Sequence, residues 1–160
     1  MTLKYSLAIL LPEQDDIVVF RQQHNQVYTP PHVTLVYPTV VYAKEHIRRV
    51  LSSVGPFTLT LTQTAVSKRG CYLYLLVQEA DFLTQLHNQL HSGPLRDERN
   101  PDMPTYVPHL TLGVFDTEEE LNAAKQSFTQ TARISAISFL THDSSGAVIK
   151  QEDIDLTRVG

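Results

Sequence analysis

The chain has 160 residues, of which 42% are hydrophobic and 19% are charged, and its formal net charge at pH 7 is −4. This length and composition predict one domain, residues 1–160, that buries its own core, and the negative charge excludes a protein that attracts long nucleic acids through a positive field. The single cysteine, Cys71, excludes an internal disulfide and is typical of a reducing compartment, so we expect a cytoplasmic protein.

The first half of the chain predicts a strand, a helix, a strand, a helix and a strand. The apolar run from Lys4 to Leu11 indicates a buried strand, because it ends at Pro12 and is far too short to span a membrane. A helix follows to about Asn25, where apolar residues recur at three- and four-residue spacing. An extended run, a second helical stripe and a strictly alternating run come next, at 32–37, 43–54 and 57–62.

The second half repeats this order. It predicts a strand at 71–77, a helix from Asp81 to about Ser92, a strand at 109–115, a helix opened by a capping box at Thr117 and a strand at 132–140. The unpatterned stretch 93–107 is the longest loop, and a short strand at 147–150 and an edge near Leu156 end the chain. We interpret the shared order as two pseudo-repeats, at about 1–66 and 71–160.

One pattern occurs at the matching point of each half. It reads Pro31-His32-Val33-Thr34-Leu35-Val36 in the first half and Pro108-His109-Leu110-Thr111-Leu112-Gly113 in the second. In a strand, the His and Thr of each copy point to one face and the apolar residues to the other. A single copy would be explained by a histidine that bonds nearby backbone, but two matching copies predict one cleft that holds both pairs.

Two histidines and two threonines in one cleft suit chemistry at phosphorus. The ordinary pKa of imidazole is near 6.5, so one of His32 and His109 can act as general base while the other acts as general acid. The hydroxyls of Thr34 and Thr111 can donate hydrogen bonds to the oxygens on which charge grows. The sequence does not assign the acid and the base, and this scheme needs neither a metal nor another cofactor.

These motifs resemble the paired His-x-Thr-x signature of the two-histidine (2H) phosphoesterase superfamily. Pro31 and the following Val36-Tyr37-Pro38 resemble its 2′-5′ RNA ligase-like branch in particular. The resemblance implies an α+β, bilobal fold with pseudo-two-fold symmetry, in which two antiparallel sheets surround a central cleft and helices lie outside. It also implies metal-independent hydrolysis of 2′,3′-cyclic phosphates, on RNA ends or nucleotides, to 2′-phosphates, and reversible 2′-5′ RNA ligation. We expect such a protein to act as a monomer.

The sequence departs from the family at one point. Some branches follow the second motif with a phosphate-binding arginine, whereas this chain has Gly113, Val114 and Phe115. Other residues near the motifs are therefore candidates for substrate contacts. The candidate cations are Lys68, Arg69, Arg96 and Arg99, and the candidate stacking rings are Tyr37, Tyr106 and Phe115.

Two other interpretations remain open. His87 and His91 have the spacing of a helical zinc pair, but Asn88 replaces the glutamate of the metalloprotease motif and no third ligand is evident. The chain could instead be a non-catalytic module that binds RNA ends or nucleotides in the same cleft. The absent arginine favours that module, and the intact pair of motifs opposes it.

Overall fold

The computed structural model describes residues 2–24, 29–67 and 71–157. The strands are β1 (Lys4–Leu10), β2 (His32–Thr39), β3 (Phe57–Val66), β4 (Tyr72–Val77), β5 (His109–Val114), β6 (Gln130–Ile134), β7 (Ala136–His142) and β8 (Val148–Asp155). The helices are α1 (Asp15–Gln23), α2 (Lys44–Leu51), α3 (Ala80–Leu90) and α4 (Glu118–Ala124), with a 3-10 turn at Gly93–Leu95. The chain is therefore α+β, as predicted.

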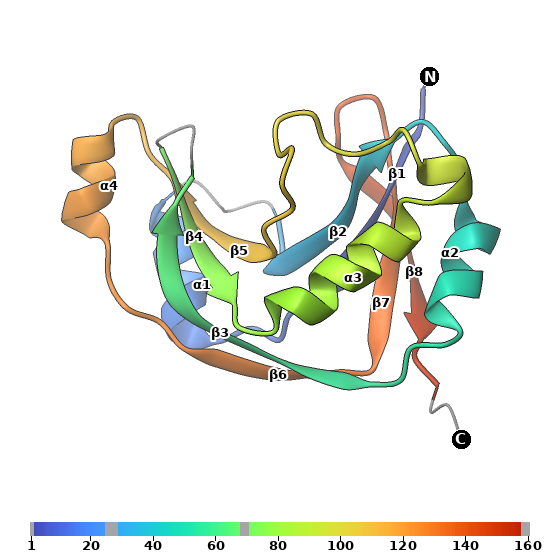
Figure 1. Cartoon of the computed structure of the whole chain (residues 1–160). Coiled ribbons are helices and arrows are strands. Elements are labelled where there is room, and N and C mark those ends of the chain that lie inside the picture. Colours follow the sequence, from blue (N-terminus) through green and yellow to red (C-terminus); the bar gives the residue numbers. More distant parts are fainter. Residues whose placement is uncertain (1, 25–28, 68–70, 158–160) are drawn as a thin grey trace.

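The strands form one curled antiparallel sheet in the order β6-β3-β4-β5-β2-β1-β7-β8 (Figure 1). The expectation of two separate sheets is wrong, because β2 and β5 join the two four-stranded halves of the sheet. This junction is narrow, since Val33 and Leu110 are its one registered pair among the described residues. The two motif strands thus lie side by side at the centre of the sheet.

Each half of the sheet contains strands from both halves of the chain. β3 pairs with β4, and β7 pairs with β1, so the chain crosses between the halves of the sheet twice. The second crossing corrects the prediction of a single strand over 132–140. The predicted strand is interrupted at Ser135, because β6 pairs with β3 in one half of the sheet, whereas β7 pairs with β1 in the other half.

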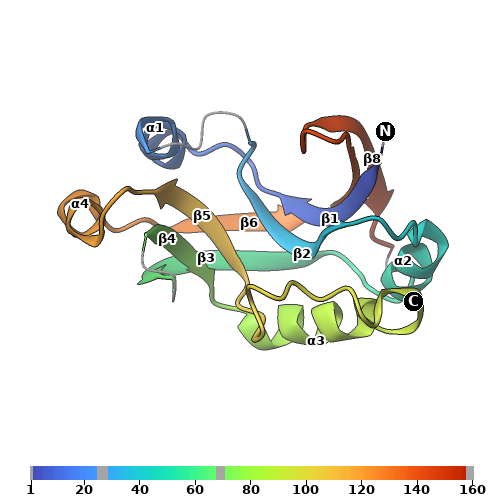
Figure 2. The same ribbon diagram turned by 90° about the horizontal axis from the view of Figure 1, so that it is seen from above.

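Two helices pack against the motif strands, and a third packs against one of these helices. α1 contacts β5, α3 contacts β2, and α2 contacts α3, so the two halves of the sheet carry their helices at opposite ends of the molecule (Figure 2). The predicted cap of α4 is confirmed, because the Thr117 hydroxyl accepts the Glu120 N–H at 3.1 Å. This helix ends at Ala124, and the ring of Phe128 beyond it packs edge to face on Phe20 with 5.1 Å between centroids.

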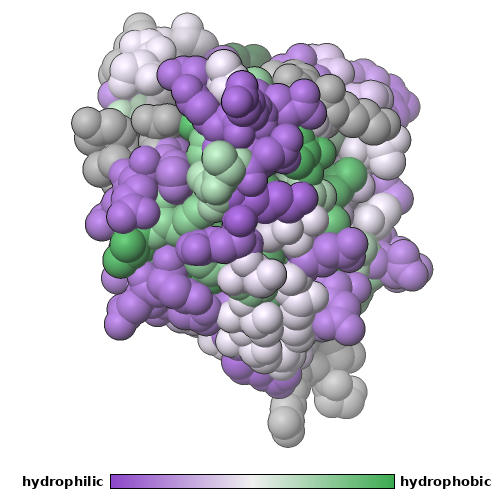
Figure 3. Space-filling view, turned by 90° about the vertical axis from the view of Figure 1, so that its left-hand side faces the viewer, coloured by the Kyte–Doolittle hydropathy of each residue, from purple (hydrophilic) through white to green (hydrophobic). Residues whose placement is uncertain are grey.

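The core consists mainly of leucine, isoleucine and valine side chains from the strands. Leu59 and Leu61 of the alternating run in β3 are fully buried, as the period of two predicts. On the face that carries α4, apolar residues reach the surface only in small areas between polar ones (Figure 3). Across the described ranges, no helix is long and apolar enough to cross a bilayer.

Candidate active site

Alternation along β2 and β5 sorts the two motifs as the sequence predicts. Val33 and Leu35 are fully buried, and the neighbouring His32 and Thr34 are only partly buried. The second motif has the same pattern, with Leu110 and Leu112 fully buried beside partly exposed polar neighbours. Each strand therefore presents its histidine and threonine on the face away from the packed leucines.

The register between β2 and β5 brings the two motifs together. Val33 lies opposite Leu110 in an antiparallel pair. His32 and Thr34 flank Val33, and His109 and Thr111 flank Leu110, so each polar pair points to the opposite face from these two paired residues. Residues that face each other across two strands point to the same side of a sheet, so all four polar side chains meet on one face.

Both imidazoles are anchored in the same way. His32 Nδ1 lies 2.8 Å from the carbonyl oxygen of Pro30, and His109 Nδ1 lies 2.6 Å from that of Val107. A carbonyl oxygen only accepts hydrogen bonds, so Nδ1 of each ring carries the proton. Nε2 of each ring is therefore the atom left to accept or deliver a proton.

Burial makes both imidazoles hard to protonate. Burial lowers the pKa of His109 to about 4, and the charge of the neighbouring His32 lowers it further. The hydrogen bond to the Val107 carbonyl has the opposite effect and raises this pKa. Burial also lowers the pKa of His32, and the charge of Arg21 lowers it further. The hydrogen bond to the Pro30 carbonyl raises this pKa in turn. An anion bound between the rings would oppose these effects, because a nearby negative charge favours the protonated form.

The surroundings of the two histidines differ. The Tyr74 ring stacks on His109, with 3.7 Å between centroids and 25° between planes. Thr111 on β5 is paired with Tyr74 on β4. Its counterpart, Thr34 on β2, is paired with Ala8 on β1. A tyrosine on one side and an alanine on the other make the site asymmetric.

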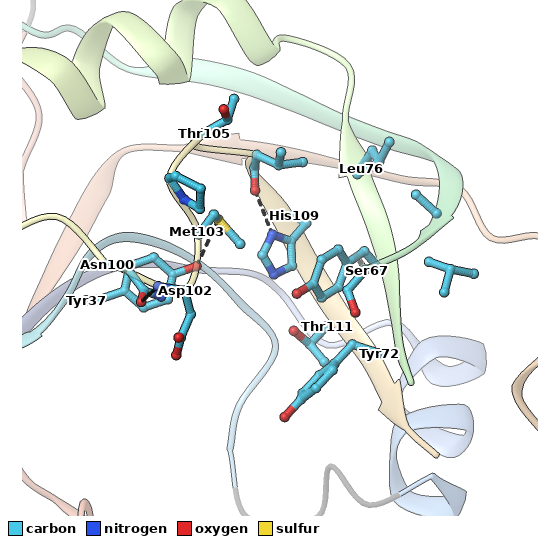
Figure 4. Close-up of a pocket in the computed structure, with 15 residues that line it drawn as sticks. Tyr37, Ser67, Tyr72, Leu76, Asn100, Asp102, Met103, Thr105, His109 and Thr111 are labelled. Carbon is cyan, nitrogen blue, oxygen red and sulfur yellow. Dashed lines mark hydrogen bonds between the residues drawn. The ribbon is translucent and has the colours of Figure 1, made fainter. Parts of the chain in front are cut away.

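A cavity of about 490 Å³ opens beside the second motif. Figure 4 shows His109 and Thr111 on β5 between Met103 on one side and Tyr72 on the other. Among the lining residues that the structure describes, Asp102 alone carries a charge. Most of the walls are aromatic or apolar, and they come from Tyr37, Ala65, Val66, Tyr72, Tyr74, Leu76, Met103, Pro104 and Val107.

The three candidate stacking rings have different positions. Tyr37 lines the cavity, and its hydroxyl lies 3.5 Å from Met103 Sδ. Tyr106 stacks on His87 at 3.9 Å between centroids and donates its hydroxyl to the Thr34 carbonyl at 2.8 Å. Phe115 is buried, with its ring 4.8 Å from that of His24. Of the three, Tyr37 is the one placed to contact a ligand in this cavity.

The candidate cations do not line the cavity in the described part of the chain. Arg99 donates to Asn88 Oδ1 at 3.1 Å on α3, and Arg96 is exposed after the 3-10 turn. Lys68 and Arg69 lie outside the described residues. The contacts of Arg96 and Arg99 do not support the prediction that they bind substrate, and for Lys68 and Arg69 it stays a prediction.

Sequence reasoning missed Arg21, the guanidinium nearest the motifs among the contacts that the structure describes. Arg21 is only 3% exposed, and its Nε donates to the Thr111 carbonyl at 3.0 Å. The available signal was an arginine in the stripe of α1 that also contains Ile17 and Phe20, which are both buried. That spacing predicts an inward-facing side chain, but it does not identify what the side chain binds.

Gly113 is required by a close approach of two segments. A Cβ atom at this position would lie 2.8 Å from His24 Cβ and 3.1 Å from Phe115 Cε2. The His24 carbonyl also accepts the Val114 N–H at 3.0 Å. The chain that leaves α1 therefore packs directly on β5 where some family branches place an arginine.

His87 of α3 and His91, the residue directly after this helix, have the contacts of buried structural residues. His91 Nδ1 lies 2.7 Å from the His87 carbonyl oxygen, which it can only reach as a donor. Burial lowers the pKa of His87 to about 4. In the ranges covered by the structure, no group of three or more His, Cys, Asp or Glu side chains is arranged to hold a metal ion.

Comparison with known proteins places this arrangement in a family. A model of the 2′-5′ RNA ligase superfamily matches residues 18–146. A protein from Halalkalibacterium halodurans is 32% identical over 134 residues, or 75% of each chain, and one from Geobacillus kaustophilus is 30% identical over 122 residues, or 69% of each. Both names describe a "Putative phosphoesterase".

Solved structures share the fold at low sequence identity. E. coli LigT complexed with 3′-AMP superposes with a TM-score of 0.64 at 19% identity, over 97% of this chain and 98% of its own. TT0787 of Thermus thermophilus gives a TM-score of 0.64 at 15% identity, over 94% and 97%. With the family model covering most of the sequence and both motifs, the chain belongs to the 2′-5′ RNA ligase superfamily, as its two motifs predict.

Proposed function

We propose that the protein is a phosphoesterase that hydrolyses 2′,3′-cyclic phosphates, on nucleotides or RNA ends, to 2′-phosphates. The observation that carries this proposal is the pair of imidazoles anchored at Nδ1 on one face of the sheet, each beside a threonine. Family membership supports a phosphoesterase, and the paired motifs favour a reaction that needs an acid and a base together.

The reaction divides between the two imidazoles. Nε2 of one histidine accepts a proton from water as its oxygen bonds to phosphorus, and Nε2 of the other donates a proton to the departing 3′ oxygen. The Thr34 and Thr111 hydroxyls donate hydrogen bonds to the non-bridging oxygens, where negative charge increases. In the ligation direction, a 5′-hydroxyl replaces water as the attacking group, and the same proton transfers join it to the phosphate.

The cavity beside His109 is the proposed place for the nucleoside of the substrate. Its tyrosines and apolar side chains suit an aromatic base, which stacks or packs without needing a charged partner. The LigT structures with 3′-AMP and with ATP show that a protein of the same fold binds nucleotides.

Met103→Ala enlarges the cavity, so it should raise KM for a cyclic nucleotide several-fold while kcat changes little.

One observation favours a second candidate, a module that binds nucleotides without turnover. Burial lowers the pKa values of both His32 and His109, and a neutral imidazole does not act as a general acid. A binding module needs no proton transfer. The two candidates therefore differ in whether a bound cyclic phosphate is opened.

The test is to incubate the protein with the four nucleoside 2′,3′-cyclic monophosphates in excess chelator and to identify products by ³¹P NMR. We expect 2′-monophosphates. His32→Ala and His109→Ala should abolish turnover, whereas Thr34→Ala and Thr111→Ala should each lower kcat by about 10² and leave a measurable rate.

His46→Ala on α2 is the matched control, because it makes the same change at a histidine whose Nε2 contacts the Leu90 carbonyl outside the site. It should keep the rate of the unaltered protein. Tight binding without turnover of any cyclic phosphate or 2′-5′ linkage would establish the binding module instead. A near-full rate in either alanine variant of the motif histidines would remove the acid-base assignment.

A further inference from the structure

We propose that Arg21 and Tyr106 form a cross-brace that holds the two motifs in position against each other, so that both are positioning residues for the reaction in the cleft. The cross-brace is defined by two contacts, from Arg21 Nε to the Thr111 carbonyl and from the Tyr106 hydroxyl to the Thr34 carbonyl. The inference rests on the proposed function only for its kinetic test.

The junction between the motif strands needs such support. β1 and β2 share five registered pairs, as do β4 and β5, whereas β2 and β5 share one within the described residues. The carbonyls of Thr34 and Thr111 lie one residue beyond that pair and accept side-chain donors. Since an acid and a base on separate strands must be held within a fraction of an ångström, one backbone pair is a weak connection for them.

The first arm comes from α1. Arg21 donates from Nε to the Thr111 carbonyl at 3.0 Å, from one terminal nitrogen to the Thr29 carbonyl at 3.0 Å and from the other to the Thr29 hydroxyl at 3.2 Å. Thr29 immediately precedes Pro30, whose carbonyl anchors His32. Arg21 thus ties the segment that anchors the first histidine to the threonine of the second motif.

The second arm comes from the connection into β5 and has the reciprocal arrangement. Tyr106 donates its hydroxyl to the Thr34 carbonyl at 2.8 Å. It immediately precedes Val107, whose carbonyl anchors His109. Tyr106 thus ties the segment that anchors the second histidine to the threonine of the first motif, as Arg21 does in the opposite sense.

A further layer fixes the second arm. The Tyr106 ring stacks on His87, with 3.9 Å between centroids and 10° between planes. His87 is 4% exposed, and its Nδ1 lies 3.4 Å from a terminal nitrogen of Arg99, which can only donate. His87 of α3 and Arg99 of the long loop therefore support the Tyr106 ring. This structural role requires neither a metal nor a substrate.

Neither arm belongs to the lining of the cavity beside His109. Arg21 is 3% exposed and donates to backbone and to Thr29, and the Tyr106 hydroxyl donates to backbone. Loss of either arm should therefore displace the proton-transferring groups without removing a contact to substrate. The expected signature is a fall in kcat with little change in KM.

The test uses two conservative variants and two matched controls. Tyr106→Phe removes one hydroxyl, and Arg21→Lys keeps the charge but cannot span both Thr29 and Thr111. The controls are Tyr42→Phe and Arg49→Lys, which make the same changes at exposed positions. On a 2′,3′-cyclic nucleotide, we expect kcat to fall about 10-fold in Tyr106→Phe and about 100-fold in Arg21→Lys, with KM within about twofold.

Two measurements do not depend on turnover. Amide hydrogen exchange of β2 and β5 should become at least about 10-fold faster in Tyr106→Phe than in Tyr42→Phe, because the junction opens more readily. The pKa of His32, followed by NMR, should rise in Arg21→Met and stay unchanged in Arg21→Lys, since the charge of Arg21 lowers it.

The outcomes separate the two proposals. Unchanged exchange and unchanged kcat in Tyr106→Phe would overturn the cross-brace even if the protein is an active phosphoesterase, and so would a rise in KM alone. If no cyclic phosphate is turned over by the unaltered protein, the proposed function fails. The cross-brace then stands or falls on hydrogen exchange in the same variant pair.

Discussion

The lowered pKa of His109 makes a quantitative prediction about stability. Its pKa is about 4 in the folded protein, and the ordinary value of about 6.5 applies to the unfolded chain. As the pH falls below about 6.5, the unfolded chain binds a proton at this position while the folded protein does not. Stability should therefore decline through this window, down to pH 4.

The magnitude follows from the two pKa values. At pH 7.5 both states are neutral at His109, so the residue adds no pH dependence. At pH 5 the unfolded histidine is almost fully protonated and the folded one is almost fully neutral, which favours unfolding by about 2 kcal/mol. His109→Gln cannot be protonated and should lack this contribution.

The assay is urea unfolding of the unaltered protein and of His109→Gln at pH 7.5 and pH 5.0, with the midpoint and slope read from fluorescence or circular dichroism. His32, His87 and His91 also have lowered pKa values, but they are present in both proteins. The difference between the two losses isolates His109. Equal losses of stability in the two proteins, within about 0.5 kcal/mol, would refute the view that this imidazole is buried and neutral.

Three further predictions concern the junction and the anion site. Gly113→Ala should destabilise the protein by about 1–3 kcal/mol in urea unfolding, because its Cβ would lie 2.8 Å from His24 Cβ; an unchanged midpoint would contradict this contact. Leu110→Ala should cost about 2–5 kcal/mol, because Leu110 is fully buried at the junction; a loss below about 1 kcal/mol would indicate that the junction collapses around the gap. Sulfate binding at pH 7 should take up a proton, measured by calorimetry in two buffers, and no uptake would mean that neither imidazole responds to an anion.

Much of this protein follows from local sequence pattern. Alternation around His32 and His109 is a property of an extended chain, so it predicts which side chains share a face before any partner strand is known. The same reasoning holds for the alternating run of β3 and for the cap at Thr117, where the interacting groups are three residues apart. The paired motifs also predict the family correctly. Both copies fall at the start of a strand.

Other features depend on contacts between distant segments. The run 132–140 has the composition of one strand, and only its partners in opposite halves of the sheet divide it at Ser135. The same holds for the joining of two expected sheets through Val33 and Leu110, which local pattern cannot predict because strand pairing is set by long-range register. Arg21 contacts a carbonyl 90 residues away, and Tyr106 one 72 residues away. Local pattern therefore predicts which side chains share one face of each motif strand, and contacts between distant segments hold the two strands in position.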